Sequence, residues 1–460
     1  MFNKEIYISR RNKLKKLVND GIIILFGNFD SPINFYNNQY YFRQDSTFLY
    51  FFGINLPNLI AVIDINNNEE VIFGNNSDID DIVWTGKELK INEIANQIGI
   101  STTYPLSHVA NYLKNKKNIH FLPPYRAEHK LLLSEILNIP SEKQKLLASK
   151  KLIQSIVSLR EIKDENEIHE ITSAINKTYE MIDYAIKNIK TLQYEKDILA
   201  LFKKFATEND MNFSFQPIIT INNQILHNTE FKNKLIPNQL LLIDTGLETE
   251  NGYAGDISRI FPIGGKFTPE QQYIYEIVED TYTKCIDLCK PDIKFLDVHL
   301  FAYENIALGL KELNILKGNI DDILTSGVIT TFFPCGLGHF LGLDVHDMEN
   351  YGEELVGYND KIKKSSEFGL KSLRLAKELK ENFVLTIEPG IYFIPELIKQ
   401  RIKDSKYSQF INKDILEKFI YVKGIRIEDD FLITKKGAKK LGNHFPNKYN
   451  EIKEYINEIY

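Results

Sequence analysis

The pattern of hydrophobic and polar residues in the first third of the chain is typical of mixed helices and strands. Apolar residues recur at helical spacing over 5–19, and short apolar runs at 21–27 and 118–123 predict buried strands. STFLYFFG (46–53) also predicts a strand, and NLIAVIDINNNEEVIFG (58–74) predicts a hairpin that turns at its asparagines. Helices and strands interleaved in this way predict one α/β domain.

Near residue 155 the pattern changes to long helices with apolar residues three and four positions apart. We therefore expect a domain boundary there, giving domains at 1–155 and 156–460. Within the second domain the pattern predicts further helices and several apolar strands. The helices are expected at 194–209, 268–289 and 296–314, and the strands at LLLID, DISRIF, FVLTIEP and GIRIEDDFLI, with a polar insertion at 395–423.

The strands LLLID and DISRIF are joined across Asn251-Gly252, which is a strong hairpin turn. Asp244 closes the first strand and Asp256 opens the second. The hairpin is therefore expected to bring these two carboxylates close together.

Composition excludes some classes of protein. The net charge of −6 argues against a nucleic-acid partner, and no apolar stretch is long enough to predict a membrane span. The first residues lack the apolar run of a signal peptide, and three cysteines are too few to staple a chain of 460 residues, so we expect a cytoplasmic protein. Cys285 and Cys289 lie four apart on a predicted helix, but no second Cys or His pair would complete a metal site, so helix packing is expected.

The stretch PCGLGHFLGLDVHD (Pro334–Asp347) holds two histidines among three glycines. Together with acidic residues elsewhere it yields five candidate metal ligands: Asp244, Asp256, His339, Glu388 and Glu428. Each of them alone also fits a plainer role, such as a turn residue, a helix cap, a strand end or a solvated acidic face.

Four carboxylates gathered in one partly buried site would repel one another unless cations balanced them. The oxygen-rich set favours manganese, cobalt or iron over a structural zinc. Two such ions about 3.5 to 4 Å apart can lower the pKa of a shared water and polarise a carbonyl, as amide hydrolysis requires.

LLIDTG, AGDIS, GLGHFLGLDVHD, VLTIEPGIYF and GIRIEDD resemble the metal motifs of the pita-bread metallopeptidases, in the branch of aminopeptidase P and prolidase. FRQDSTFLYFFGI and FLPPYRAEHK resemble the amino-terminal domain of these enzymes. The resemblance implies an α+β protein in which an amino-terminal α/β domain precedes a pita-bread catalytic domain.

Carried over to this sequence, the resemblance makes the five candidates the ligands of two divalent ions, usually Mn²⁺, with Co²⁺, Fe²⁺ or Zn²⁺ as alternatives. Asp256 and Glu428 would bridge the ions, Asp244 would bind one of them through both oxygens, and Glu388 would also carry protons.

The remaining roles follow from the same resemblance. His227 would hold substrate or shuttle protons, and His346 would steady the scissile carbonyl. Arg426 matches the arginine two residues before the last glutamate ligand. Cys335 departs from the pattern, because the family often has histidine there.

We therefore expect an Xaa-Pro aminopeptidase that acts on proline-containing peptides. The alternative is an Xaa-Pro dipeptidase, because Arg374 matches the prolidase arginine that holds a dipeptide's free carboxylate, although it also fits a surface arginine on a basic loop. Members of this fold that have lost their metals serve as peptide-binding modules, but here all five ligands are present. Relatives are commonly dimers or tetramers, so a homo-oligomer is expected.

Overall fold

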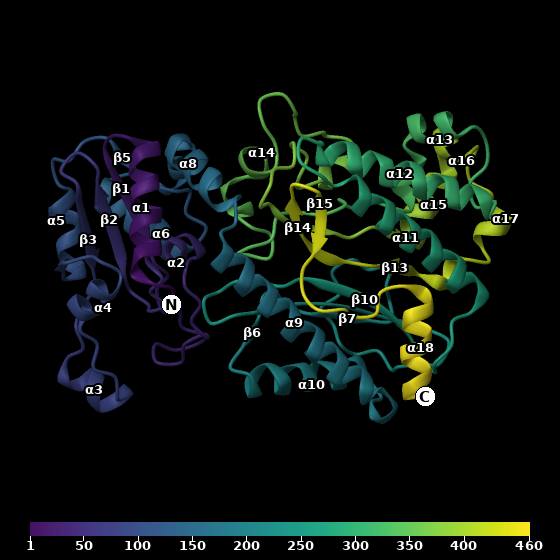
Figure 1. Cartoon of the computed structure of the whole chain (residues 1–460), viewed down its shortest axis with the longest axis horizontal. Coiled ribbons are helices and arrows are strands. Elements are labelled where there is room, and N and C mark those ends of the chain that lie inside the picture. The colour runs from purple at the N-terminus through teal and green to yellow at the C-terminus, as the bar shows by residue number, and fades with distance from the viewer. The chain divides into compact units, whose positions relative to one another are not determined.

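The computed structural model describes residues 1–460, which form two compact units (Figure 1). The amino-terminal unit consists of Met1–Arg160 and Met348–Val356, and the carboxy-terminal unit consists of Glu161–Asp347 and Gly357–Tyr460. The expected boundary at residue 155 falls within a helix, α8 (Lys150–Arg160).

The amino-terminal unit contains one five-stranded sheet with the order β4-β3-β2-β1-β5. Its β2 and β3 pair antiparallel around the asparagine turn, where Asn68 takes a left-handed φ of 49°, and this confirms the predicted hairpin. Successive side chains of β1 and β2 point to opposite faces of the sheet, and nearly all of them are buried, so both faces are covered. The strands are β1 (Ile22–Phe26), β2 (Ile60–Asp64), β3 (Glu69–Phe73), β4 (Thr102–Tyr104) and β5 (Ile119–His120).

Helices bury this sheet. Val109, Leu113 and Leu133 of α5 and α6 join the core on one face, and α1 packs against α2 and α8. The helices of this unit are α1 (Lys4–Val18), α2 (Ser46–Phe52), α3 (Ile79–Thr85), α4 (Ile91–Gln97), α5 (Val109–Leu113), α6 (Ala127–Leu137), α7 (Ser141–Leu147), α8 and α14 (Glu353–Val356).

The prediction of a strand at 46–53 is wrong, because these residues form α2. The Asp45 carboxylate accepts the backbone N–H of Phe48 at 2.9 Å and caps the helix, and Gly53 ends it with a left-handed φ of 62°. Every residue of α2 is buried, so its apolar run carries no periodicity that would separate a strand from a buried helix.

The carboxy-terminal unit contains two three-stranded antiparallel sheets, β10-β8-β7 and β11-β14-β15, and two strand pairs, β12-β13 and β6-β9. The two larger sheets meet along β10 and β14. The strands are β6 (Asn212–Phe213), β7 (Ile218–Thr220), β8 (Leu240–Thr245), β9 (Leu247–Glu248), β10 (Ile257–Pro262), β11 (Val384–Ile387), β12 (Gly390–Tyr392), β13 (Gly424–Arg426), β14 (Asp429–Thr434) and β15 (Gly437–Lys440).

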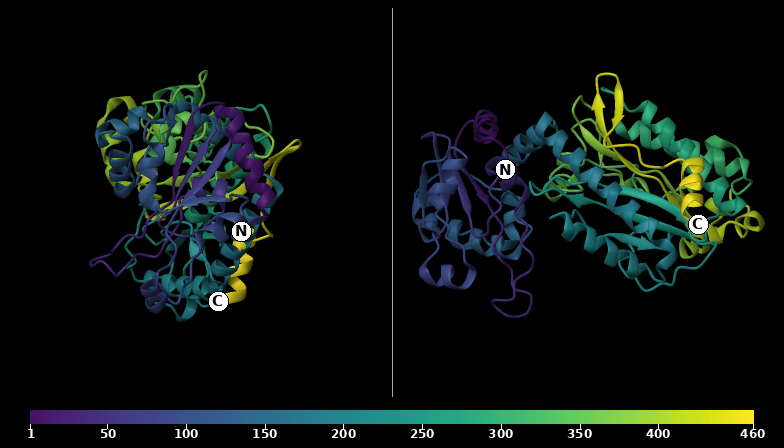
Figure 2. Two further views of the ribbon diagram at one scale, coloured as in Figure 1. Left: turned by 90° about the vertical axis from the view of Figure 1, so that its left-hand side faces the viewer. Right: turned by 60° about the horizontal axis from the view of Figure 1, so that its bottom comes forward.

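Long helices cover these sheets (Figures 1 and 2). Helices α9 and α10 pack against the strands of the first sheet and its neighbour β9, and α11 packs against β11, β13 and β15. The helices are α9 (Glu165–Lys187), α10 (Glu195–Glu208), α11 (Pro269–Leu288), α12 (Phe295–Glu312), α13 (Ile320–Ser326), α15 (Pro395–Lys403), α16 (Ser405–Ser408), α17 (Lys413–Leu416) and α18 (Tyr449–Ile459).

The helices predicted at 194–209, 268–289 and 296–314 correspond to α10, α11 and α12. The polar insertion folds into α15, α16 and α17. Cys285 and Cys289 are buried free thiols at the end of α11, which agrees with a packing role. None of the helices combines the length and the apolar character that crossing a membrane requires.

Candidate metal centre

The predicted hairpin places two of the acidic residues. Strands β8 and β10 pair antiparallel with Asp244 opposite Ser258, and Asp256 immediately precedes β10. Gly252 closes the turn, since its N–H donates to Thr249 O at 2.8 Å and its φ is 84°. A side chain at Gly246 would overlap the Gly255 carbonyl oxygen, so the two arms approach more closely than any other residue would permit.

The glycine- and histidine-containing stretch runs along the edge of β11. Glu388 donates its N–H to Leu337 O at 2.8 Å, and Thr386 donates to His339 O at 2.9 Å. A side chain at Gly338 would overlap the Thr386 carbonyl oxygen. This close pairing places His339 beside β11 and Glu388 at the end of the same strand.

Glu428 joins the two larger sheets. The strand predicted for GIRIEDDFLI is interrupted, with β13 ending at Arg426 and β14 beginning at Asp429. At the interruption the Glu428 N–H donates to Ser258 O at 3.2 Å, and the Ser258 hydroxyl donates to a Glu428 carboxylate oxygen at 2.8 Å. The last predicted ligand therefore lies against the hairpin that carries the first two.

These elements bring the predicted ligands together. Asp256, His339 and Glu428 are all buried, and each offers one ligand atom within 4.8 Å of the others. His339 Nε2 lies 3.4 Å from Asp256 Oδ2 and 3.6 Å from Glu388 Oε1. Asp244 is close enough for its charge to raise the pKa of Asp256, Glu388 and Glu428.

The hydrogen bonds of His339 select one form of its ring. Nδ1 lies 3.0 Å from Phe340 O, and a carbonyl oxygen can only accept, so the network assigns the proton to Nδ1. Nε2 is then the ring nitrogen that faces the carboxylates, and it can bind a metal ion once it carries no proton. A neutral imidazole held in this way is the form that binds a metal ion.

The buried acidic residues repel one another when they are charged and no cation balances them. Burial raises the pKa of Asp256 and Glu428 well above the usual carboxyl range, and the neighbouring carboxylates add to the effect. Burial also raises the pKa of Glu388, although His339 and Arg426 oppose the shift. Hard divalent cations fit this set because they bind oxygen and would hold all four carboxylates in the charged form.

Arg426 is the cation that the chain itself supplies. Burial would lower the pKa of this guanidinium, but Tyr392 and the carboxylates of Asp244 and Glu428 raise it well above its usual value. Its nitrogens bond to Asp244 Oδ2, to Tyr392 Oη at 2.9 Å and to Ser258 Oγ at 2.9 Å. Arg426 therefore helps to hold the proposed metal ligand Asp244 in position.

His346, His227 and Arg374 lie beside this group. The rings of His339 and His346 are 4.3 Å apart and meet edge to face. Partial burial lowers the pKa of His227; Asp244 opposes this shift, while Arg426, Arg374 and His346 add to it. The charge of Arg374 acts on both His227 and Glu388, so its guanidinium lies near the site.

Cys335 also lies within reach of the site. Burial raises the pKa of its thiol to about 12, and the Glu388 carboxylate adds to the effect. The thiol is therefore uncharged near neutral pH, in the place where a histidine could carry a proton.

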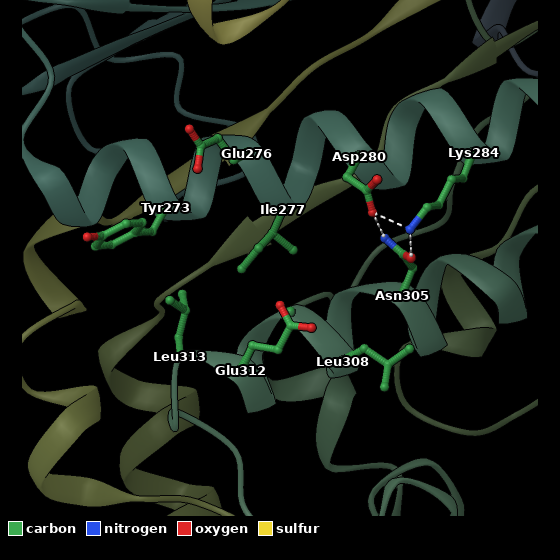
Figure 3. Close-up of a pocket in the computed structure, with 10 residues that line it drawn as sticks. Tyr273, Glu276, Ile277, Asp280, Lys284, Asn305, Leu308, Glu312 and Leu313 are labelled. Atoms are coloured by element: carbon green, nitrogen blue, oxygen red, sulfur yellow. Dashed lines mark hydrogen bonds and ion pairs between the residues drawn. The ribbon is translucent and has the colours of Figure 1, made fainter.

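A cleft elsewhere on the unit contains none of the predicted residues. It has a volume of about 350 Å³ and lies between α11 and α12, where Asp280, Lys284 and Asn305 bond to one another (Figure 3).

Comparison with known proteins identifies the family. The family model for metallopeptidase family M24 matches residues 169–435, and the model for the aminopeptidase P N-terminal domain matches residues 7–120. The chain belongs to metallopeptidase family M24. The M24 match contains all five predicted ligands, and the N-terminal match contains β1 to β5.

Relatives place the chain in the aminopeptidase P branch of M24. A probable Xaa-Pro aminopeptidase of Sclerotinia sclerotiorum is 33% identical over 91% of this chain and 74% of its own, and one of Botryotinia fuckeliana is 32% identical over 91% and 88%. Escherichia coli aminopeptidase P, solved with the inhibitor Pro-Leu, is 25% identical, with a TM-score of 0.82 over 100% of this chain and 99% of its own. The predicted fold class, an amino-terminal α/β domain followed by a pita-bread domain, is confirmed.

The M24 site also contains residues that sequence reasoning missed. Ser258 and Tyr392 hold Arg426, and an Asp430 carboxylate oxygen accepts the Asp256 N–H at 3.0 Å. Asp430 belongs to the EDD cluster and Ser258 to the AGDIS motif, so both lie in motifs that the sequence analysis had already singled out. Tyr392 had no signal beyond its place in an apolar strand.

Proposed function

We propose that this M24 protein is an Xaa-Pro aminopeptidase that removes an amino-terminal residue preceding proline, using two divalent ions, with Mn²⁺ as the expected metal. The observation that carries the proposal is the cluster of Asp256, His339 and Glu428, with the Glu388 carboxylate 3.6 Å from His339 Nε2 and the charge of Asp244 acting on the other three acids. The names of the relatives and the fold of E. coli aminopeptidase P support the same activity.

Asp244, Asp256, His339, Glu388 and Glu428 would hold the metal ions, with Asp256 and Glu428 between them. Divalent ions in such a site polarise the peptide carbonyl and lower the pKa of a water molecule. Arg426 would hold Asp244 in its orientation, because the guanidinium bonds directly to that carboxylate.

Glu388 would carry the proton from the attacking water to the leaving group. Its side chain is partly exposed, and burial raises its pKa above the usual carboxyl range, which favours its taking up a proton from the attacking water. The nitrogen of proline has no N–H and forms a tertiary amide, so it must gain a proton before it leaves.

His346 would donate a hydrogen bond to the carbonyl oxygen as negative charge develops on it. Its ring packs edge to face against that of His339, a proposed metal ligand, and this supports a position near the reacting carbonyl. His227, which is near enough to Asp244 for that charge to affect its pKa, would hold the substrate.

Arg374 favours a second candidate, an Xaa-Pro dipeptidase. Its guanidinium lies near the site, where it could bind the free carboxylate of a dipeptide through two parallel hydrogen bonds. A tripeptide would place its carboxylate one residue further away and would not need this contact.

Substrate length tests the two candidates. We expect the wild type to cleave an Xaa-Pro-Yaa tripeptide at least as fast as the Xaa-Pro dipeptide, and Arg374→Ala to leave tripeptide turnover within about threefold of wild type. Steady-state kinetics on both peptides measures this, with Arg374→Lys as the control that keeps the charge but loses the two-pronged geometry.

A wild type that cleaves the dipeptide alone, with KM raised at least about tenfold in Arg374→Ala, would instead establish the dipeptidase. A wild type that cleaves neither peptide in the presence of Mn²⁺ would refute both candidates.

A further inference from the structure

A buried ion pair lies behind the stretch that carries both site histidines. Lys163 Nζ is 2.7 Å from Asp347 Oδ2, and their side chains are only 1% and 0% exposed. Charges so deeply buried are costly to desolvate, and such a pair contributes more to a fixed arrangement than to net stability. The question is which arrangement this pair fixes.

The Asp347 end of the pair holds the backbone on either side of His346. Its carboxylate accepts the Asp344 N–H at 3.3 Å, and its own N–H donates to Phe340 O at 2.9 Å. The same Phe340 carbonyl accepts the Nδ1 proton of His339. One carbonyl therefore links the His339 ring to the turn that presents His346.

The ion pair is also in close contact with the glycine stretch, at Gly342. A Cβ at Gly342 would lie 2.8 Å from Lys163 Nζ and would overlap the Asp347 carboxylate. Gly342 O accepts the Ala254 N–H at 2.8 Å, two residues before Asp256. Only glycine permits the stretch to lie between the ion pair and the hairpin.

At the other end of the pair, the backbone of Lys163 is held by neighbouring secondary structure. Its N–H donates to Asn382 O at 2.8 Å, just before β11, and the next residue, Asp164, caps α9 through two backbone N–H groups. The backbone of Lys163 is thus fixed between the residue before β11 and the start of α9.

We propose that Lys163 is a positioning residue which, through Asp347, holds the His346 imidazole at the place where it meets the scissile carbonyl. The proposal rests on the proposed function of His346. A misplacement of about 1 Å can reduce a rate about 100-fold, and the Lys163–Asp347 bond is the charged tie of this turn to α9 and β11.

The test substitutes Lys163→Met, which keeps the length of the side chain and removes its charge. We expect kcat to fall about 10- to 100-fold, with bound metal unchanged and KM within about threefold of wild type. Lys163→Arg should recover most of the loss. Lys116→Met is the matched control, because Lys116 also bonds a buried aspartate, Asp64, at 2.7 Å, but in the amino-terminal unit; its kcat should equal that of wild type.

A double-mutant cycle with His346→Ala separates positioning from general damage. If Lys163 acts through His346, Lys163→Met should lower kcat by less than about threefold in the His346→Ala background. An equal fold loss in both backgrounds would overturn the proposal, as would a wild-type kcat in Lys163→Met.

Lys163→Met leaves a buried carboxylate without its cation, so Lys163→Met/Asp347→Asn is the second variant. It should regain thermal stability over the single variant while turnover stays low. Recovery of turnover together with stability would show that the pair only stabilises the fold.

A readout without substrate keeps the inference separate from the proposed function. In zinc-loaded protein with ¹⁵N-labelled histidine, Lys163→Met should shift or broaden the His346 ring resonances, and Lys116→Met should not. An unchanged His346 signal would refute the positioning role. Failure of the wild type to cleave Xaa-Pro peptides would refute the proposed function instead.

Discussion

Asp256 is the residue at which most of the site's constraints meet. Asp430 holds its backbone, His339 Nε2 faces its carboxylate, and the hairpin places it beside Asp244. Its carboxylate is buried among other carboxylates, which raise its pKa. Asp256 therefore contributes to the site through both its charge and its fixed position.

We expect Asp256→Asn to abolish turnover while the protein stays folded, since the amide keeps the shape but cannot balance a cation. Activity should fall at least about 100-fold, and bound Mn²⁺ should fall from two ions per chain to fewer. Metal analysis after dialysis and circular dichroism check these outcomes, with the exposed Asp322→Asn as control.

Retained turnover in Asp256→Asn would refute the bridging role. Fewer than one bound ion in the saturated wild type would refute the pair of metals.

Sequence reasoning finds residues of this kind when chemistry makes them unusual. Four acids at apolar strand ends and a histidine among glycines stand out because burying them without a purpose is costly. Ser258 and Lys163 do not stand out, because serine and lysine are common on surfaces and their partners lie 170 and 184 residues away.

At the scale of elements, the site depends on how closely β11 and residues 337–341 approach. They pair through backbone hydrogen bonds, and Gly338 leaves no room for a side chain. The position of His339 relative to Glu388 is therefore set by backbone contact and not by side-chain packing.

Gly338→Ala should separate this pairing, because its Cβ would overlap the Thr386 carbonyl oxygen. We expect a loss of about 2 to 4 kcal/mol in the free energy of unfolding and weaker metal binding. Urea unfolding and metal titration measure both.

Gly86→Ala is the matched control for Gly338→Ala. Gly86 has a left-handed φ of 70° but open space around it, so this change should cost only about 1 kcal/mol and leave metal binding intact. Equal losses in the two variants would show that steric overlap at Gly338 is not the cause.

Elements were predictable where the pattern has a period or a clear turn. The hairpins at 58–74 and around Asn251-Gly252 follow from turn chemistry, and α10 to α12 follow from apolar spacing. STFLYFF failed because a fully buried helix and a buried strand look alike, and only the cap at Asp45 distinguishes them.

At the scale of the carboxy-terminal unit, charge couples metal binding to folding. Four carboxylates lie close enough for their charges to raise the pKa values of Asp256, Glu388 and Glu428, and the buried guanidinium of Arg426 lies among them. Metal ions should therefore stabilise the folded protein, and their removal should leave its stability sensitive to pH.

In the metal-free fold the pKa values of Asp256 and Glu428 lie above the unfolded value of about 4. The folded state then binds protons more tightly, so this contribution to stability is complete below the unfolded pKa and is lost as pH rises through the folded pKa. Chelated protein should melt at a lower temperature at about pH 8 than at about pH 5.

Metal-loaded protein should show no such loss, because metal binding requires the charged carboxylates. Melting temperatures with Mn²⁺ and with a chelator should therefore diverge as pH rises. Parallel pH profiles for the two forms would contradict this account.

Glu428, which joins the two larger sheets, also comes late in the sequence. Its position determines when we expect the enzyme to become active during its own synthesis. The ribosome delivers Asp244 and Asp256 first, then His339 and Glu388, and Glu428 only after all of them. A nascent chain that ends before Glu428 lacks one of the residues that would lie between the ions. The order of the sequence thus delays peptidase activity until the fold is nearly finished.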